Sequence, residues 1–567
     1  MRAAQSEFDA IIVGAGPAGS AAALMLAQRG KEVLLLEKAR VPGERNMTGG
    51  VLYGDFEGGF GIRNLLPDFE QTAPLQRRIL SHEVTVLGKP DQERGRARYY
   101  RLTKNSLAAR LGLFAMGFET GHDYAVLKRP FDRWLAEKAV EAGAMLATGT
   151  TVVSLVKEGQ SVLGVRTTKE DLRAEVVIDA GGVTSKLAEE AGLRESLVPR
   201  QLYHGVKRVY RLDAETIEKR FRVNSGEGRA MSFIGSFMHG VGGGAFLYTN
   251  NETISIGLVA SMDSLLRATT ERFDEVGKLL DVQDELESHP MLAPLLDGAR
   301  LVEYTGHNVP KGYRCLPRTP YCDGFMVTGD ALGAFVKLGP MIDGMRRAMS
   351  SGMMAATAYL EAASSGSFRA RNLSRYRALL SPIYEDVERS GRESFLSESS
   401  VVYGLLPRIV SSVGYFTREL RFTPSEEPAA PKSALRRVQD GTSLLKYDED
   451  EAYSHIRVDQ EKASQSITKP WVPVCPVNCY TIATPKGNFG SFRDLYEVNL
   501  DALARAEAGG DRRKKALDMT REEVAGSRLR FDHVACVACG SCGAIGPPEM
   551  VLFTHEKDGH GVRYAYG

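Results

Sequence analysis

Five of the seven cysteines lie between positions 475 and 542, and their spacing strongly limits what this part of the chain can form. Cys536, Cys539 and Cys542 make a C-x-x-C-x-x-C run, and Cys475 is followed at once by Pro476. Three thiolates at this close spacing, with a fourth from a remote Cys-Pro, are the ligand pattern of a 4Fe–4S cluster. We therefore predict a one-electron redox centre bound by these four cysteines.

A second cluster is not expected. Two-cluster ferredoxins repeat the pattern, and a second triplet would fall at Gln465, Thr468 and Trp471, none of which can bind iron. The position for a second remote cysteine holds Gly546, although Pro547 still follows it. One complete four-thiolate site remains. The extra cysteine, Cys479, is expected to be a buried structural thiol.

Zinc is the competing metal, but sites with four cysteines usually pair two C-x-x-C knuckles. Three cysteines at successive intervals of three favour a cluster. A disulfide framework is not expected, because the chain is long, its cysteine number is odd and no secretory signal is seen.

The composition is that of a globular protein of several domains. The 567 residues carry 72 Lys and Arg against 71 Asp and Glu, so no overall field attracts nucleic acid. A strand begins by about residue 8, which leaves no room for a signal peptide, and no apolar stretch is long enough to span a bilayer. The sequence predicts a cytoplasmic chain with reduced thiols, and leaves peripheral membrane contact open.

A nucleotide-binding motif opens the chain. The apolar run 8–13 leads into G-x-G-x-x-G at Gly14, Gly16 and Gly19, followed by an Ala/Leu-rich helix to about residue 29 and a strand ending at Glu37. In this setting the first glycine permits a tight turn, the second lets the backbone approach a pyrophosphate, and the third allows close helix packing. Glu37 is expected to accept hydrogen bonds from a ribose. The motif alone does not separate NAD from FAD.

Two later segments favour FAD by resemblance. EVVIDAGGVTS (175–185) and GFMVTGD (324–330) resemble signatures of flavoprotein monooxygenases and related reductases. The resemblance implies FAD contacts at Gly181, Gly329 and Asp330, with Asp330 on the ribityl chain. A long helix from about Pro340 would then place its positive N-terminus at the flavin ring. Asp330 could instead be an ordinary helix cap.

The predicted fold class is α/β: a Rossmann-like FAD-binding domain of the glutathione-reductase/monooxygenase type, an inserted antiparallel sheet and a C-terminal ferredoxin-like α+β iron–sulfur domain. Short alternating runs such as FLYTNNETISIGLVASM indicate the sheet, with a hairpin at the TNNE. The expected boundaries are 1–200 and 300–365 for the FAD domain, 201–299 for the inserted quinone-binding sheet, 366–454 for a helical and linker region, and 455–567 for the cluster domain with a charged helical insertion at 490–528.

Together, the flavin motifs and the cysteine pattern resemble electron-transfer-flavoprotein:quinone oxidoreductase, as a fusion of the Fix-type flavoprotein with its ferredoxin-like subunit. Matching stretches include RNMTGGVLYG (45–54), VLKRPFDRWLAEKAVEAGA (126–144), HGVGGGAFLYTNNETISIGLVASMD (239–263), the Pro-Lys-Gly-Tyr region (310–313), GFMVTGDALG (324–333) and DGHGVRYAYG (558–567). The step from Cys475 to Cys536 is longer than is typical of the family, and the insertion accounts for most of it.

This resemblance implies FAD, one 4Fe–4S cluster, the alpha and beta subunits of electron-transfer flavoprotein as donor, a membrane quinone as acceptor, and monotopic attachment to the cytoplasmic face of the membrane. It also implies that the donor complex could bifurcate electrons. Further FAD contacts are expected at Lys38, Thr48, Gly49, Gly50, Arg129, Gly339, Met341 and Ile342.

The quinone channel is expected along 233–248, where Gly242, Gly243 and Gly244 allow close approach to a planar ring. Tyr248 and His239 could bond a quinone carbonyl or supply protons. A core hairpin with a glycine bulge explains the same residues equally well. Membrane contact is expected from the apolar segment 401–416, which could equally be a core helix broken by a proline.

Two other functions remain open. A prenyl-chain reductase of the geranylgeranyl type would explain the flavin motifs and an apolar channel, but not the cysteines. Alternatively, the chain could be a non-catalytic subunit that only passes electrons within a larger complex.

Overall fold

A parallel sheet organises the nucleotide-binding part of the chain. The computed structural model describes residues 7–567 apart from 48–49, 103–121, 339–340, 398–408, 410–416, 424–432, 449–452, 507–510 and 555. The sheet runs in the order β16-β17-β10-β1-β2-β7, with β8 and β9 joined to β10. Its strands are β1 (Phe8–Val13), β2 (Val33–Leu36), β7 (Met145–Ala147), β8 (Val152–Glu158), β9 (Ser161–Thr167), β10 (Asp171–Asp179), β16 (Tyr321–Cys322) and β17 (Phe325–Val327).

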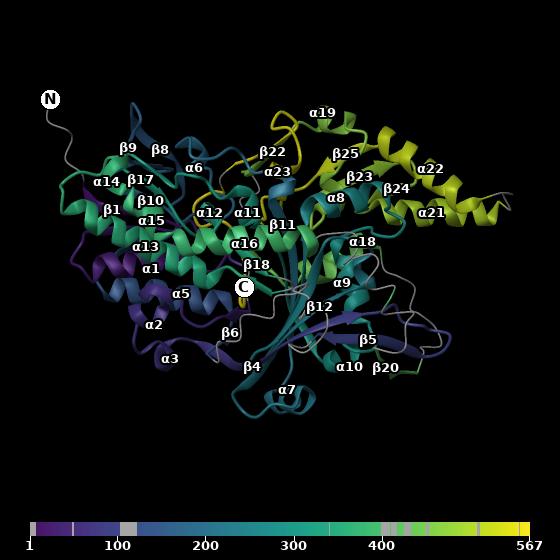
Figure 1. The fold of residues 1–567 in the computed structure, drawn as a ribbon. Coiled ribbons are helices and arrows are strands. Elements are labelled where there is room, and N and C mark those ends of the chain that lie inside the picture. Colours follow the sequence, from purple (N-terminus) through teal and green to yellow (C-terminus); the bar gives the residue numbers. More distant parts are fainter. Residues whose placement is uncertain are drawn as a thin grey trace.

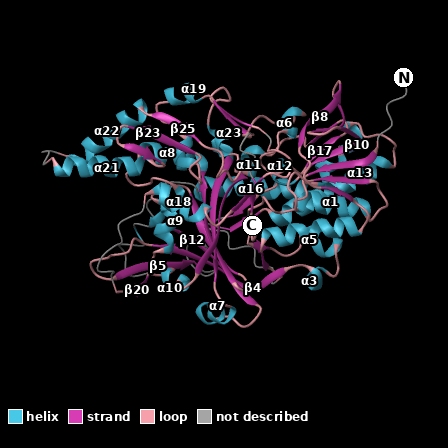
Figure 2. Ribbon diagram, turned by 180° about the vertical axis from the view of Figure 1, so that it is seen from behind, coloured by secondary structure: helices cyan, strands magenta, loops and turns pink. Residues whose placement is uncertain are grey.

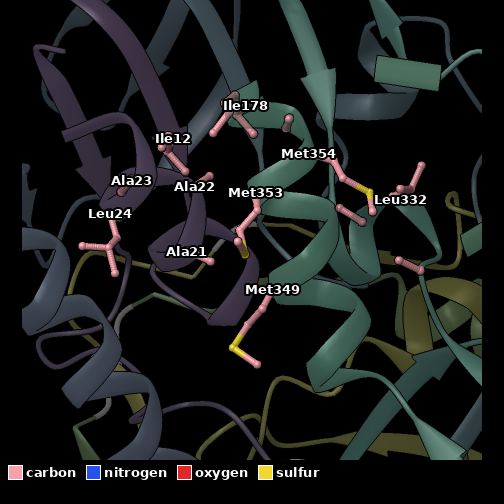
Figure 3. Packing of buried hydrophobic residues seen from close by; sticks show 14 of the residues in the cluster. Ile12, Ala21, Ala22, Ala23, Leu24, Ile178, Leu332, Met349, Met353 and Met354 are labelled. Carbon is pink, nitrogen blue, oxygen red and sulfur yellow. The ribbon is translucent and has the colours of Figure 1, made fainter. Parts of the chain in front are cut away.

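The predicted strand–turn–helix–strand unit at the N-terminus is confirmed. Helix α1 (Pro17–Ala27) consists largely of small residues and is buried almost all round. It packs between the sheet and α13 (Met345–Ala363), and Figure 3 shows Ala21 and Ala22 of α1 beside Met349 and Met353 of α13. Gly352 permits this contact, because a Cβ there would lie 2.1 Å from the Ala18 carbonyl oxygen. The small side chains of α1 therefore bring the glycine-rich turn close to α13.

Helix α13 begins later than predicted. A helix from about Pro340 was expected, but β18 (Val336–Leu338) and β19 (Met341–Asp343) pair as a hairpin, and the helix starts only after Gly344. The helices of this part of the chain are η1 (Glu57–Gly59), α2 (Ile62–Leu65), α3 (Phe69–Thr72), α5 (Lys128–Glu141), α6 (Leu187–Glu190), α11 (Gly312–Cys315), α12 (Gly329–Leu332), α13, α14 (Ala370–Leu373), α15 (Arg375–Leu379) and α16 (Ser381–Ser397).

A second sheet of ten described strands stands beside the first (Figures 1 and 2), in the order β15-β11-β14-β13-β12-β4-β5-β20, with β3 and β6 attached. Its pairs are antiparallel except β12 with β4, which are parallel. The predicted hairpin is confirmed as β13 and β14. The strands are β3 (Val51–Leu52), β4 (Leu75–Leu87), β5 (Arg96–Leu102), β6 (Tyr124–Val126), β11 (Leu202–Arg211), β12 (Glu227–Gly235), β13 (Gly243–Thr249), β14 (Thr253–Ser261), β15 (Arg300–Pro310) and β20 (Arg418–Arg421).

This sheet extends beyond the residues 201–299 that the sequence suggested. Strands β4 to β6 and β15 come from segments expected in the FAD domain, since they pair with β12 and β11 rather than with the parallel sheet. Its connecting helices are η2 (Pro199–Gln201), α7 (Ala214–Phe221), η3 (Ser236–Met238), α8 (Met262–Glu271), α9 (Leu279–Glu287) and α10 (Ala293–Leu296). The segment 401–416 lies outside the described residues apart from Ile409. Within the described chain, no helix is long and apolar enough to cross a membrane.

The C-terminal region contains two antiparallel strand pairs, β21 with β27 and β22 with β26, and a three-stranded antiparallel sheet in the order β24-β23-β25. Between β24 and β25, α21 and α22 form a helical hairpin that projects from the body in Figures 1 and 2 and occupies most of the predicted insertion 490–528. The elements are α18 (Ala434–Thr442), β21 (Lys446–Asp448), β22 (Ile456–Val458), α19 (Gln460–Gln465), α20 (Trp471–Val474), β23 (Tyr480–Thr484), β24 (Gly487–Phe489), α21 (Phe492–Arg505), α22 (Arg512–Gly526), β25 (Arg528–Phe531), α23 (Ser541–Ile545), β26 (Val551–Phe553) and β27 (Gly561–Arg563).

The last residues return to the nucleotide-binding part. The Thr151 backbone N–H donates to Asp558 Oδ1 at 2.8 Å, and the Tyr564 N–H donates to the Glu44 carbonyl at 2.8 Å. The C-terminal region is therefore attached both to the parallel sheet and, through its cysteine loops, to the second sheet.

Candidate functional site

The glycine-rich turn has the shape that a dinucleotide site requires. Gly14 has a φ of +99°, and a Cβ there would lie 2.6 Å from the Ala180 carbonyl oxygen. Gly19 packs the helix on the turn, since a Cβ there would lie 1.9 Å from the Gly14 oxygen. Gly16 caps α1, and the nearest atom to a Cβ there would be Asn46 Nδ2 at 3.5 Å. The N-terminus of α1 is thus open to a phosphate.

The turn opens into a cavity of about 240 Å³ between the two sheets. Nine of the predicted site residues line it: Gly14, Gly16, Glu37, Lys38, Gly181, Tyr248, Gly329, Asp330 and Ile342. They come from the ends of β1, β2, β10 and β17, from the second sheet and from the β18–β19 hairpin, so that segments far apart in sequence meet at one place. This is the position that ligands take in open α/β sheets, at the carboxyl ends of the strands.

Glu37 holds the turn in place. Its Oε2 accepts a hydrogen bond from the Ala15 N–H and its Oε1 one from the Ala39 N–H, both at 2.9 Å. Each carboxylate oxygen has a further lone pair for a ribose hydroxyl. The carboxylate therefore orders the glycine-rich turn and can still bind a nucleotide.

Asp330 lies in the first turn of α12 and faces the cavity, where it is partly accessible yet surrounded by protein. Burial raises its pKa to about 6. Close by, Gly344, Met345 and Ala348 bring the start of α13 to the cavity wall. The cavity wall therefore contains both a carboxylate and a helix N-terminus. The carboxylate could bond the hydroxyls of a ribityl chain, and the helix N-terminus would stabilise negative charge on a flavin.

An aromatic wall closes the cavity on the side of the second sheet. The rings of Phe246 and Tyr248 stack with centroids 5.0 Å apart, and burial raises the pKa of Tyr248. Gly50 lies against this wall, since a Cβ there would lie only 1.9 Å from Tyr248 Cδ2. The wall offers a flat apolar surface for a planar ring system.

Charged residues that the sequence did not single out also reach the cavity. Glu556, from the C-terminal region, forms ion pairs with Lys38 and, at 3.0 Å, with Arg45. Burial opposes the charge of Glu556, but Lys38 and Arg45 outweigh it and lower its pKa to about 2. Lys128 also lines the cavity and pairs with Asp132. Arg129, the predicted contact, does not line it.

Other predicted contacts stand apart from this cavity or cannot be placed. Thr48, Gly49 and Gly339 lie outside the described residues, and the side chain of Met341 does too. His239 points elsewhere, with its Nε2 2.6 Å from Glu285 Oε2. Gly242, Gly243 and Gly244 lie at the start of β13, where Gly243 has a φ of +155° and a Cβ would lie 2.1 Å from the Val259 oxygen. These glycines serve close strand pairing, and their quinone role stays a prediction.

A second, smaller cavity is lined by all five C-terminal cysteines. Cys475, Cys536, Cys539 and Cys542 come together there although 61 positions separate the first two. Cys479 is buried, as expected, but it lies among them, and its N–H donates to Cys475 Sγ at 3.3 Å. His455 Nε2 is 3.3 Å from Cys536 Sγ.

The chemistry of this set suits a metal cluster. Burial raises the pKa of Cys539 to about 12, so a thiolate at this position needs a neighbouring cation. In the described chain, no three His, Cys, Asp or Glu side chains converge as ligands of a single metal ion. A cubane makes a different demand, because each thiolate binds its own iron and the four sulfurs surround the cluster. Four cysteines around one cavity fit that demand.

The two cavities share a wall. Ala538, within the C-x-x-C-x-x-C run, lines the nucleotide cavity. Gly540 packs against Thr184, which also lines it, and a Cβ on Gly540 would lie 2.8 Å from Thr184 Cγ2. At the start of α23, Ser541 Oγ donates to Oδ1 of Asn308 on β15 at 2.9 Å. Any groups bound in the two cavities would therefore be neighbours.

Comparison with known proteins identifies the family of the chain. The sequence matches the family described as FAD dependent oxidoreductase over residues 9–309, more than half of the chain. The chain belongs to this family. Protein FixC of Escherichia coli strain K12 is 38% identical over 374 residues, which cover 65% of this chain and 80% of FixC. The family match ends before the first C-terminal cysteine.

The probable electron transfer flavoprotein-quinone oxidoreductase YdiS from the same strain is 33% identical over 409 residues, or 72% of this chain and 89% of YdiS. The resemblance drawn from the sequence is confirmed by these two relatives. A geranylgeranyl bacteriochlorophyll reductase-like protein from Thermoplasma acidophilum has a similar structure, with a TM-score of 0.53 and 22% identity over 72% of this chain and 92% of that one. At this identity the likeness shows the shared fold. The chain is thus an FAD-dependent oxidoreductase, and the cavity between the sheets is its candidate FAD site.

Proposed function

We propose that this protein passes electrons from reduced electron-transfer flavoprotein through a 4Fe–4S cluster and FAD to a membrane quinone. The observation that carries the proposal is the shared wall, in which Ala538 and Gly540 of the cysteine run lie against the FAD cavity. Electron transfer between two centres requires this kind of proximity. A C-terminal region with ferredoxin-like function, attached to a flavin domain, supplies it within one chain.

The residues have separate tasks in this proposal. Cys475, Cys536, Cys539 and Cys542 hold the cluster, and the Gly14 turn, Glu37 and Asp330 hold the dinucleotide. When bound, FAD holds one or two electrons and a cluster holds one, which connects a one-electron donor to a two-electron acceptor. A quinone takes up two electrons and two protons to become a quinol. Phe246 and Tyr248 give its ring a flat apolar approach to the FAD cavity.

The partners follow from the same proposal. The YdiS name points to an electron transfer flavoprotein and a quinone. A membrane quinone requires contact with the bilayer surface, which we place at the cytoplasmic face, through segment 401–416 as one candidate. We also propose that the donor belongs to a bifurcating complex.

The test is turnover with defined partners. Purified protein with measured FAD and iron is mixed with reduced electron-transfer flavoprotein and a water-soluble quinone, and quinone absorbance is followed. We expect reduction that depends on both the donor and the cluster. Inactivity of the isolated chain, with activity only inside a larger complex, would favour the non-catalytic subunit. Loss of double bonds from a polyprenyl lipid would favour the prenyl reductase.

A further inference from the structure

A buried lysine, in a segment that connects strands of the second sheet, bonds the backbone of one cysteine of the smaller cavity. Lys278 directly precedes α9, and its residue is only 2% exposed. Its Nζ donates to the Val472 and Cys475 carbonyl oxygens, each at 2.7 Å. These carbonyls end α20 and begin the Cys475–Pro476 turn, so the ammonium holds the backbone of the remote cysteine.

Among the described residues, this ammonium makes no direct ion pair. Burying a charge is costly unless it is paired, yet in the described part of the chain Lys278 Nζ has no ion pair within 4 Å. The neighbouring Asp281 carboxylate instead accepts from the Lys278 backbone N–H at 2.9 Å and pairs with Arg437 at 2.5 Å. Two carbonyls accept from two of the three N–H donors of Lys278, and the carboxylates of Asp281 and Asp494 attract its charge without a direct contact at Nζ. The thiolates of a filled cluster site would add negative charge close by.

The second sheet fixes the rest of the same turn. The Tyr304 hydroxyl donates to the Pro476 carbonyl at 2.9 Å. Gly306 leaves room for the proline ring, because a Cβ there would lie 2.8 Å from Pro476 Cγ. The turn is therefore seated on β15 from one side and held by Lys278 from the other, which gives the charge a fixed place relative to Cys475.

We propose that Lys278 is the positioning residue that seats the Cys475–Pro476 turn and, through its buried positive charge, raises the reduction potential of the cluster. The inference rests on the proposed cluster. Reduction adds one negative charge to the cluster, and a fixed positive charge nearby stabilises that reduced form. Potentials of iron–sulfur clusters depend on such local charge and hydrogen bonding. The second sheet would thereby tune a redox centre bound by another part of the chain.

The experiment compares Lys278→Gln with the wild type by EPR-monitored redox titration, after iron, sulfide and flavin have been quantified. Neutralising the charge should lower the cluster's midpoint potential, by about 59 mV if the reduction equilibrium changes roughly tenfold. Lys469→Gln is the matched control. Lys469 is also fully buried and its Nζ donates to three carbonyls, including Val524 at 2.7 Å, but none of the three belongs to a cysteine. Its loss should leave the potential unchanged.

A Lys278→Gln protein that holds four irons at the wild-type potential would overturn the proposal. If Lys278→Gln loses the cluster, Lys278→Arg is used instead. This variant keeps the charge and should keep both the cluster and a midpoint potential near that of the wild type. If Lys278→Arg, which keeps the charge, lowers the midpoint potential as much as removal of the charge is expected to, the proposal is overturned as well. A wild-type protein without a cluster would refute the proposed function itself, and its iron content distinguishes that outcome from the others.

Discussion

Replacing Glu37 by Gln tests the assignment of the nucleotide site. Both carboxylate oxygens accept backbone hydrogen bonds at 2.9 Å, one from the glycine-rich turn and one from Ala39. Gln keeps one side-chain oxygen that can accept one of these hydrogen bonds. Its NH2 group would face the other backbone N–H, and two donors cannot form a hydrogen bond with each other. A hydrogen bond to a charged group contributes about 1.5 to 3 kcal/mol. We expect the FAD-free protein to lose about 2 kcal/mol of unfolding free energy by chemical denaturation.

FAD binding should weaken by about tenfold, since a ribose bond to a charged acceptor is replaced by a neutral one, a difference of about 1.4 kcal/mol. Fluorescence titration of the FAD-free protein measures this constant. Glu32→Gln is the control, because Glu32 lies just before the same strand but is exposed. A Glu37→Gln protein that binds FAD as tightly as the wild type would refute the assignment of Glu37 to the ribose.

Three further changes test other parts of the account. Asp330→Asn should stabilise the FAD-free protein by about 3 kcal/mol at pH 7, because burial raises the folded pKa to about 6 from an ordinary 3.8. This difference in unfolding free energy should grow from pH 4 to 6 and vanish below pH 4. FAD binding should weaken. A difference that does not change with pH, measured by chemical denaturation, would contradict this expectation. Gly306→Ala should lower the iron content, since its methyl group would press on the cysteine–proline turn, whereas Gly526→Ala, with open space around it, should not. Cys536→Ser should abolish the cluster's EPR signal and leave FAD bound, and the buried thiol Cys315, replaced by Ser, should affect neither.

Local patterns predicted much of this structure. The β1–α1–β2 unit follows from an apolar strand, a glycine turn and small helical residues that are all neighbours in sequence. The β13–β14 hairpin follows from alternation on either side of a turn. The four predicted ligand cysteines line one cavity although 61 positions separate Cys475 from Cys536, and their spacing was predicted from cluster chemistry rather than from a local fold.

The remainder depends on contacts between distant segments. Glu556 reaches Lys38 only because the C-terminal strand pairs bring residues 551–563 to the nucleotide cavity, and nothing around Glu556 in the sequence indicates this. Lys128 rather than Arg129 lines the cavity, a difference of one position that a helix start decides. His239 contacts Glu285 instead of lining the cavity. Sequence patterns could not set these orientations, since each depends on the packing of a separate element.

The central claim is that an iron–sulfur cluster and FAD occupy adjoining sites in one chain. Metal and flavin analysis of the purified protein, with low-temperature EPR after dithionite reduction, tests it most directly. We expect about four irons and one FAD per chain, with the signal of a single reduced cubane. Zinc in place of iron, or a yellow protein without metal, would contradict it.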